Sequence, residues 1–280
     1  MPFFFPDACV SPLQRGCFTF LLLLAYSFLG WCGEMVYCSI GQRKLCEKRG
    51  FLNGLLCPIY GHGALVVLLA LDGGCENPLL TFLLGAVLTS AVEYITSYGM
   101  EKLFHMRWWD YSHYRFHLRG RVCLLNSTLF GLASVFLCHF ANPPIARRLG
   151  ALFAAGLGVP LALVLGVLYL ADIAVSVRSA LRVGSHLAKL HAVHDELAQR
   201  LEQLRAGQRQ FTEAQRQRLE EVRAEAQRKL HALYERQDFF DRRLLQSFPT
   251  LKSARHSEAL SKLREYLENR KQFIKENKEM

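Results

Sequence analysis

CFTFLLLLAYSFLGWCGEMVYCSI, residues 17–40, is the stretch that decides the fold. Its only charged side chain is Glu34. A helix needs about 20 apolar residues to cross a bilayer, so the stretch predicts a membrane-spanning helix. A carboxylate inside hydrocarbon costs about 3 kcal/mol, which makes Glu34 a candidate functional residue.

Four more hydrophobic stretches follow the first. The five predicted spans are residues 17–40, 54–71, 79–99, 122–141 and 151–177. The second is short and is interrupted by Pro58, Gly61 and Gly63, so it either crosses the membrane or re-enters on the same side. The pattern predicts an all-α protein with an integral membrane bundle of about five spans.

The composition changes sharply after the fifth stretch. All nine cysteines lie at or before Cys138, and the chain beyond Arg178 is polar and rich in Arg and Glu. A soluble core would mix the two compositions. We therefore predict a membrane domain (1–178), a long cytoplasmic coiled-coil helix (179–248), and a short helix with a charged end (249–280).

Apolar residues in the predicted tail recur in steps of three and four. The first seam positions are Leu187, Leu190, His194, Leu197, Leu201, Leu204, Gln208 and Phe211. This spacing is typical of a coiled coil. The tail either pairs two chains in parallel or folds back near Gly207 as a hairpin, and we favour the homodimer.

Lys and Arg predict the orientation, because cytoplasmic loops carry more of them. Cations are dense after the first and third spans and absent after the second. The sequence thus predicts a protein of the cell inner membrane with its N-terminus outside and its C-terminus in the cytoplasm. Anionic membrane lipids account for the formal net charge of +10, and no nucleic-acid-binding motif is present.

Polar residues recur near the predicted cytoplasmic ends of the spans. Glu34 and Glu93 both lie about 9 Å inside the boundary at the helical rise. The predicted ligand or ion cavity consists of Glu34, Tyr37, Tyr60, His62, Glu93, Ser97 and Asn126. In the alternative, each Glu pairs with a nearby Arg and holds helices together. Asp172 is expected only to mark the end of the fifth span.

Histidines in the loop after the third span raise the question of a metal site. His113 and His117 have i, i+4 spacing. The surrounding residues are aromatic and basic, which is typical of a membrane interface. We therefore predict no metal site and no cofactor, and expect Asp110 to cap a turn or to pair with Arg107 or Arg115.

Several short blocks occur in a distinctive order. They are Trp31-x-x-Glu34, Arg49-Gly-Phe-Leu-x-Gly54, Cys57-Pro-Ile-Tyr-Gly-x-Gly63, Glu93-Tyr94 and Trp109-Asp-Tyr-Ser112. Over residues 24–132 the chain resembles the family of bacterial membrane proteins known as putative ABC-transporter type IV. It departs from the family pattern at Lys48, Leu55 and His117. The resemblance implies a permease. Because the chain has no phosphate-binding G-x-x-x-x-G-K-[ST] loop, any ATPase would be a separate subunit, facing the loop 100–121.

Three functions fit these features. The first is a transport permease-like component with a polar cavity open to the cytoplasm. The second is a membrane-embedded enzyme acting on a lipid, with Glu34 or Glu93 as acid or base; Arg49, Arg107 and Arg121 would contact a phosphate at the cytoplasmic face. The third is a scaffold that acts through its coiled coil.

Overall fold

The computed structural model describes residues 6, 9–42, 50–71, 77–206, 220, 221, 224, 228, 232, 239–253 and 256–279. The membrane part holds α1 (Pro12–Gln42), α2 (Pro58–Ala70), α3 (Pro78–Phe104), β1 (Met106–Arg107), β2 (His117–Leu118), β3 (Val122–Cys123), α4 (Leu124–Phe136), a π-helical turn (Leu137–Ala141) and α5 (Asn142–Ala154). The chain continues with α6 (Gly158–Ala206), α8 (Phe239–Ser247), β4 (Lys252–Ser253) and α9 (Ser257–Glu279). The fold is mostly helical, and the four strands have two residues each.

Among the described residues, four helical stretches are long and apolar enough to cross a membrane, whereas five spans were predicted. They are Pro12–Ile40, Pro78–Phe104, Leu124–Ala154 and Gly158–Val193. The fifth predicted span began too early, because the chain turns at Gly156, whose φ is 75°, before α6 begins. The protein is thus an integral membrane protein.

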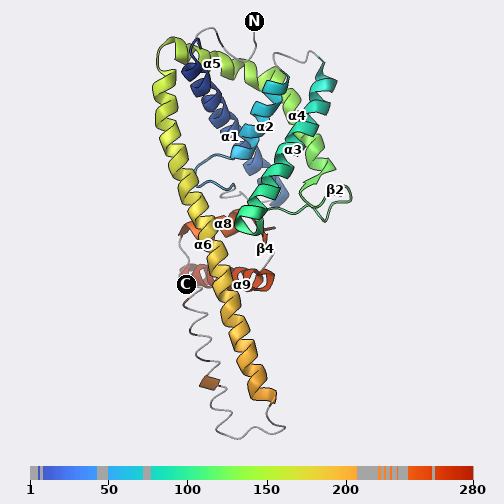
Figure 1. Ribbon diagram of the computed structural model, residues 1–280, viewed down its shortest axis with the longest axis vertical. Helices are drawn as coiled ribbons and strands as arrows, with labels where there is room; N and C mark the ends of the chain where they lie inside the picture. The colour runs from blue at the N-terminus through green and yellow to red at the C-terminus, as the bar shows by residue number, and fades with distance from the viewer. Residues whose placement is uncertain are drawn as a thin grey trace.

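The second predicted span is the short helix α2. Its 13 residues reach about 20 Å, less than the hydrocarbon thickness of about 30 Å. It runs antiparallel to α1 and returns the chain to the end of the bundle at which α1 begins, so α3 starts there (Figure 1). The segment 50–57 supplies the missing length as non-helical chain that lies against α1 and α6.

Glycines allow α1 and α2 to approach closely. A Cβ on Gly61 would lie 2.5 Å from the backbone oxygen of Leu23, and one on Gly30 would lie 2.2 Å from the Cβ of Tyr60. Neither position has room for a larger residue. This contact places Tyr60 against the face of α1 that carries Glu34.

The helix α6 runs without a break through the predicted domain boundary at residue 178. It has 49 residues and extends beyond the membrane bundle (Figure 1). There α8 and α9 pack on it, and we call α8, β4 and α9 the C-terminal unit. β4 pairs with β1 in the antiparallel register Met106↔Ser253, so the C-terminal unit also contacts the loop after α3.

No coiled coil is seen in the described part of the tail. Leu187 and Leu190, predicted as seam residues, are buried in one core with Leu260 and Leu263 of α9. The heptad spacing marks a buried face, and the chain's own C-terminal helix covers it. The seam beyond Gly207 lies outside the described residues, and the homodimer stays a prediction.

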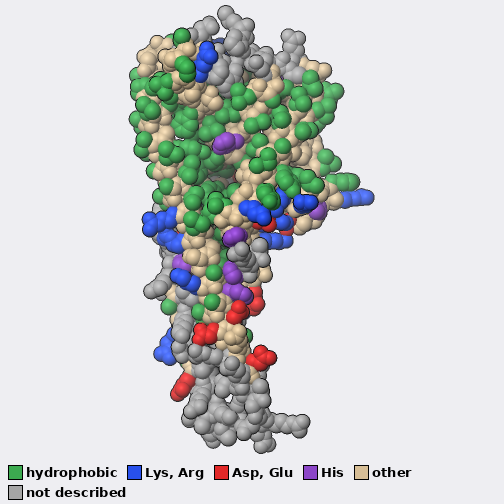
Figure 2. All heavy atoms as spheres, in the orientation of Figure 1, with side chains coloured by type: hydrophobic (Ala, Val, Ile, Leu, Met, Phe, Trp, Pro, Cys, Tyr) green, Lys and Arg blue, Asp and Glu red, His purple; other side chains and the backbone are tan. Residues whose placement is uncertain are grey.

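Figure 2 shows how side chains are distributed along the molecule. On the face that it shows, hydrophobic side chains cover much of the membrane bundle, and Lys and Arg gather mainly where this surface ends. Acidic side chains lie mainly beyond that level, toward the C-terminal unit. The described surface therefore has the apolar band and basic border expected for a bilayer protein.

Candidate functional site

Two glutamates in the bundle each accept a hydrogen bond from a tyrosine. Tyr60 at the start of α2 donates to Oε2 of Glu34 at 2.6 Å. Tyr111, in the loop after α3, donates to Oε1 of Glu93 at 3.1 Å. Four different segments of the chain therefore supply these side chains, which we call the acidic pair and its tyrosines.

No cation among the described residues forms an ion pair with the acidic pair. Glu93 is only 4% exposed, and its Oε2 has no hydrogen-bond partner among the described residues. Glu34 is half-buried, and after burial and Glu93 its charge also raises the pKa of the Tyr111 hydroxyl. Within the described residues, neither glutamate forms an ion pair. Glu93 is a buried carboxyl group inside a membrane-spanning helix, so it is a candidate for a group that holds a proton.

Tyr111 is held in place by the loop around it. Its backbone N–H donates to the carbonyl of Gly120 at 2.8 Å. Gly120 has a φ of 69°, and a Cβ there would lie 2.4 Å from Asp110, so only glycine fits. Burial and then the charge of Glu93 raise the pKa of the Tyr111 hydroxyl, which keeps it a donor.

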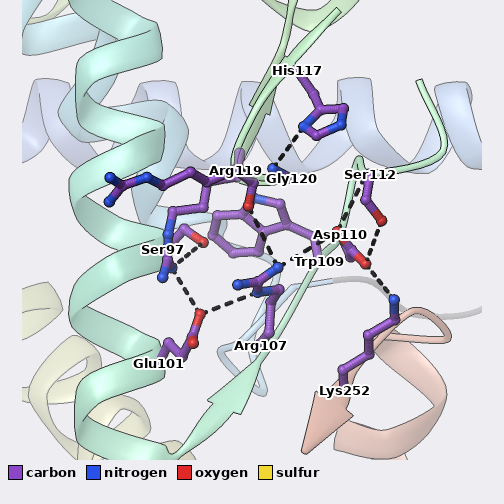
Figure 3. A network of polar contacts seen from close by, with 11 residues as sticks. Ser97, Glu101, Arg107, Trp109, Asp110, Ser112, His117, Arg119, Gly120 and Lys252 are labelled. Carbon is purple, nitrogen blue, oxygen red and sulfur yellow. Dashed lines mark hydrogen bonds and ion pairs between the residues drawn. The ribbon is translucent and has the colours of Figure 1, made fainter. Parts of the chain in front are cut away.

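Asp110 ties the same loop to the C-terminal unit (Figure 3). It accepts hydrogen bonds from Lys252 of β4 at 2.5 Å, from the Ser112 hydroxyl at 2.9 Å and from the Ser112 backbone at 3.1 Å. Burial alone raises the pKa of Asp110, but the bonds from Lys252 and Ser112 outweigh it and lower the pKa to about 2. Asp110 is thus a carboxylate that both caps a turn and lies 3.8 Å from Arg107, as predicted.

Two arginines, Arg107 and Arg121, pair with Glu101. Arg121 Nη1 lies 2.9 Å from Glu101 Oε2, and Arg107 Nε lies 3.1 Å from the same oxygen. Arg121 also donates to Ser97 at 3.3 Å. Glu101, two helical turns beyond Glu93 on α3, is therefore the glutamate that an arginine neutralises.

Residues 21–177 match the family described as putative ABC-transporter type IV. The chain belongs to this family. No curated protein and no solved structure matches it. The match to putative ABC-transporter type IV covers more than half of the chain and includes the acidic pair, both tyrosines and Glu101. It ends at Val177, before the C-terminal unit.

The remaining predicted site residues take no part in the two glutamate–tyrosine hydrogen bonds. Tyr37 is 55% exposed. His62 is exposed, with Nδ1 2.8 Å from the Pro58 carbonyl one turn earlier. Asn126 is half-buried on α4. Arg49 lies outside the described residues.

Asp172 was expected only to mark the end of a span, but it binds the non-helical segment before α2. Its Oδ1 accepts from the backbone of Asn53 at 2.9 Å and from the Asn53 amide at 3.0 Å, and its Oδ2 accepts from the backbone of Gly54 at 2.8 Å. The backbone groups freed by the short α2 are thus partly satisfied by α6. An aspartate inside an apolar stretch was the available signal.

Within the described residues, no three His, Cys, Asp or Glu side chains come together as metal ligands would. His117 instead accepts a hydrogen bond from the Gly120 backbone at 3.0 Å, if its Nδ1 is unprotonated. His113 packs against the ring of Tyr114 at 4.3 Å. Both histidines therefore have local roles in the loop.

Proposed function

We propose that this protein is a membrane component of a transport system and that its acidic pair binds and releases a proton. The observation that carries the proposal is the buried Oε2 of Glu93. It lacks a hydrogen-bond partner among the described residues, and it lies inside a membrane-spanning helix. Acidic groups inside a membrane bundle are typical of proton and ion pathways.

The surroundings favour a proton over a metal ion. Each carboxylate is met by a tyrosine hydroxyl that donates, and a metal would need acceptors instead. A protonated carboxyl group can donate a hydrogen bond through its own O–H. A proton shared by Glu34 and Glu93 would be held by such a bond from one carboxyl group to the other. The tyrosines would then hold the pair in position as the proton is gained and lost.

Family membership supports a transport role over a catalytic one. In the enzyme alternative, Arg107 and Arg121 would contact a phosphate, but both pair with Glu101. We therefore propose a permease-like component with a polar cavity open to the cytoplasm. Its partners would be membrane lipids, a second copy of the chain and a separate ATPase.

The first test measures protonation directly. The purified full chain, reconstituted in lipid, is titrated with pH while infrared spectroscopy follows the carboxyl C=O band. We expect a titrating band that is lost in Glu93→Gln and shifted in both Glu34→Gln and Tyr111→Phe. The matched control is Glu101→Gln, which changes a glutamate on the same helix that pairs with arginine and should leave the band in place.

The second test measures movement. Proteoliposomes loaded with a pH-sensitive dye receive an imposed pH gradient, and proton flux is recorded for the same variants. Flux that falls in Glu34→Gln and Glu93→Gln but not in Glu101→Gln would support transport through the pair. A carboxyl band that does not depend on Glu93, together with flux equal in all variants, would refute the proposal.

A further inference from the structure

The chain between α3 and α4 forms a small hairpin that projects sideways from the bundle (Figure 1). We call residues 111–123 the α3–α4 hairpin. β2 and β3 pair antiparallel within it, with His117 opposite Cys123. It leaves the bundle where α3 ends and α4 begins, at the level where the apolar surface gives way to Lys and Arg (Figure 2).

Large apolar side chains lie on the surface of this hairpin. Phe116 is 61% exposed and Leu118 is 57% exposed. Leu124 and Leu125, in the first turn of α4, continue the exposed apolar surface. Because this surface is continuous with the membrane-facing side of α4, lipid is the medium that would cover it.

Cations alternate with these apolar residues along the hairpin. Arg115 and Arg119 are both exposed, and neither forms an ion pair with a described residue. Arg115 lies over the ring of Phe116, 5.5 Å from its centroid. A segment in which exposed apolar side chains alternate with unpaired guanidinium groups fits the boundary between acyl chains and headgroups.

The hairpin is braced by backbone contacts before any lipid binds. Leu124 N donates to the Phe116 carbonyl at 3.0 Å, and Arg121 N donates to the Leu118 carbonyl at 3.0 Å. Trp109 Nε1 donates to the Arg121 carbonyl at 3.0 Å and so ties the base of the hairpin to the loop. A braced surface loses little conformational entropy on binding, which favours a specific contact.

We propose that the α3–α4 hairpin binds an anionic phospholipid. Arg115 and Arg119 would contact the phosphate-bearing headgroup, and Phe116 and Leu118 would lie against the first part of the acyl chains. Guanidinium groups bind phosphate oxygens through paired N–H donors, and each cation near an anionic surface adds to the attraction. Since the apolar half of the surface would have no role for a free anion, the occupant is a lipid rather than inorganic phosphate.

The test uses Phe116→Trp as a reporter in the full chain, reconstituted in nanodiscs. The discs contain phosphatidylcholine with a minor fraction of brominated lipid, either phosphatidylglycerol or phosphatidylcholine. Bromine quenches tryptophan at close range, and the protein without the substitution supplies the background from its own tryptophans. We expect the anionic brominated lipid to quench Trp at position 116 at about a tenfold lower mole fraction than the zwitterionic one.

Matched variants separate the hairpin from general membrane charge. Arg115→Gln with Arg119→Gln should remove the preference for the anionic lipid while leaving quenching by brominated phosphatidylcholine. Arg147→Gln with Arg148→Gln changes two exposed arginines on α5, at the other end of the bundle, and should leave the preference intact. Equal quenching by both lipids, or a preference that survives the hairpin variant, would overturn the proposal. Inorganic phosphate that abolishes the preference at constant ionic strength would overturn it as well, in favour of a free-anion site.

Discussion

Asp110 and Tyr111 are consecutive residues whose side chains bind opposite parts of the molecule. Asp110 accepts a hydrogen bond from Lys252 of the C-terminal unit, and Tyr111 donates one to Glu93 inside the bundle. Two adjacent residues, Asp110 and Tyr111, therefore connect the C-terminal unit to the acidic pair. Any displacement of β4 from β1 would pull on the residue that neighbours Tyr111.

Replacing Lys252 should weaken the docking of the C-terminal unit in a pH-dependent way. The pKa of Asp110 is lowered from 3.8 to about 2, so its stabilising effect is complete above about pH 4 and is lost as the pH falls toward 2. Lys252→Met should raise the pKa of Asp110 and reduce the part of the stability that is lost at acid pH. The loss at neutral pH should be about 1 kcal/mol, because Lys252 itself is well exposed.

Trp108 reports this docking. It is fully buried, and its ring centroid lies 5.0 Å from that of Phe248, which follows α8. We expect its fluorescence to change between pH 4 and pH 2 in the natural protein, and at higher pH in Lys252→Met. Lys262→Met, which removes a surface pair with Glu258, is the control. Identical acid transitions in both variants would contradict the role given to Lys252.

Replacing Glu101 by Gln and replacing Glu93 by Gln should have different effects on the stability of the protein. Glu101→Gln leaves Arg121, whose side chain is 9% exposed, without its ion-pair partner, and should lower stability by about 2 kcal/mol. Glu93→Gln removes a buried charge that acts against Glu34 and should leave the melting temperature unchanged or raise it. Thermal melting in one detergent compares the two. A larger loss from Glu93→Gln would mean that Glu93 holds the bundle together.

Asp172 should hold the non-helical segment before α2. Asp172→Asn replaces the oxygen that accepts from Gly54 N with a donor, and should cost about 1–3 kcal/mol. Loosening of the segment should expose Cys57, which is buried, to a maleimide reagent. Asp195→Asn, at an exposed site beside His191, is the control. Unchanged labelling of Cys57 in Asp172→Asn would contradict the assignment.

Hydropathy and charge spacing predicted much of the membrane part. Helical rise alone predicted that Glu34 and Glu93 lie at one depth, and this shared depth stays a prediction. The sequence did not reveal which glutamate an arginine neutralises. Glu93, Ser97 and Glu101 share one helix face, and only the fold of the following loop brings Arg107 and Arg121 to the outermost of them.

Contacts distant in the chain were the least predictable. Lys252 reaches Asp110 across 142 positions, and no local pattern marks either residue for the other. The seam at Leu187 and Leu190 was correctly predicted to be buried, but periodicity specifies a face and not the helix that covers it. Because α9 belongs to the same chain as α6, its effective concentration at these two positions is high. This favours α9 over a second copy of the chain as the helix that covers them.

Two glycines of α1, three residues apart, offer the sharpest test of the α1–α2 contact. A Cβ at Gly30 would lie 2.2 Å from the Cβ of Tyr60, whereas a Cβ at Gly33 meets nothing within 4 Å. Gly30→Ala should therefore push α2 away, weaken the bond from Tyr60 to Glu34, and cost about 1–3 kcal/mol by overpacking. Gly33→Ala should be neutral or stabilising, since alanine favours the helix by about 1 kcal/mol over glycine. Thermal melting gives the stabilities, and the carboxyl infrared band reports whether Glu34 has changed its surroundings. Equal melting temperatures for the two variants would show that α2 does not pack on α1 through Tyr60.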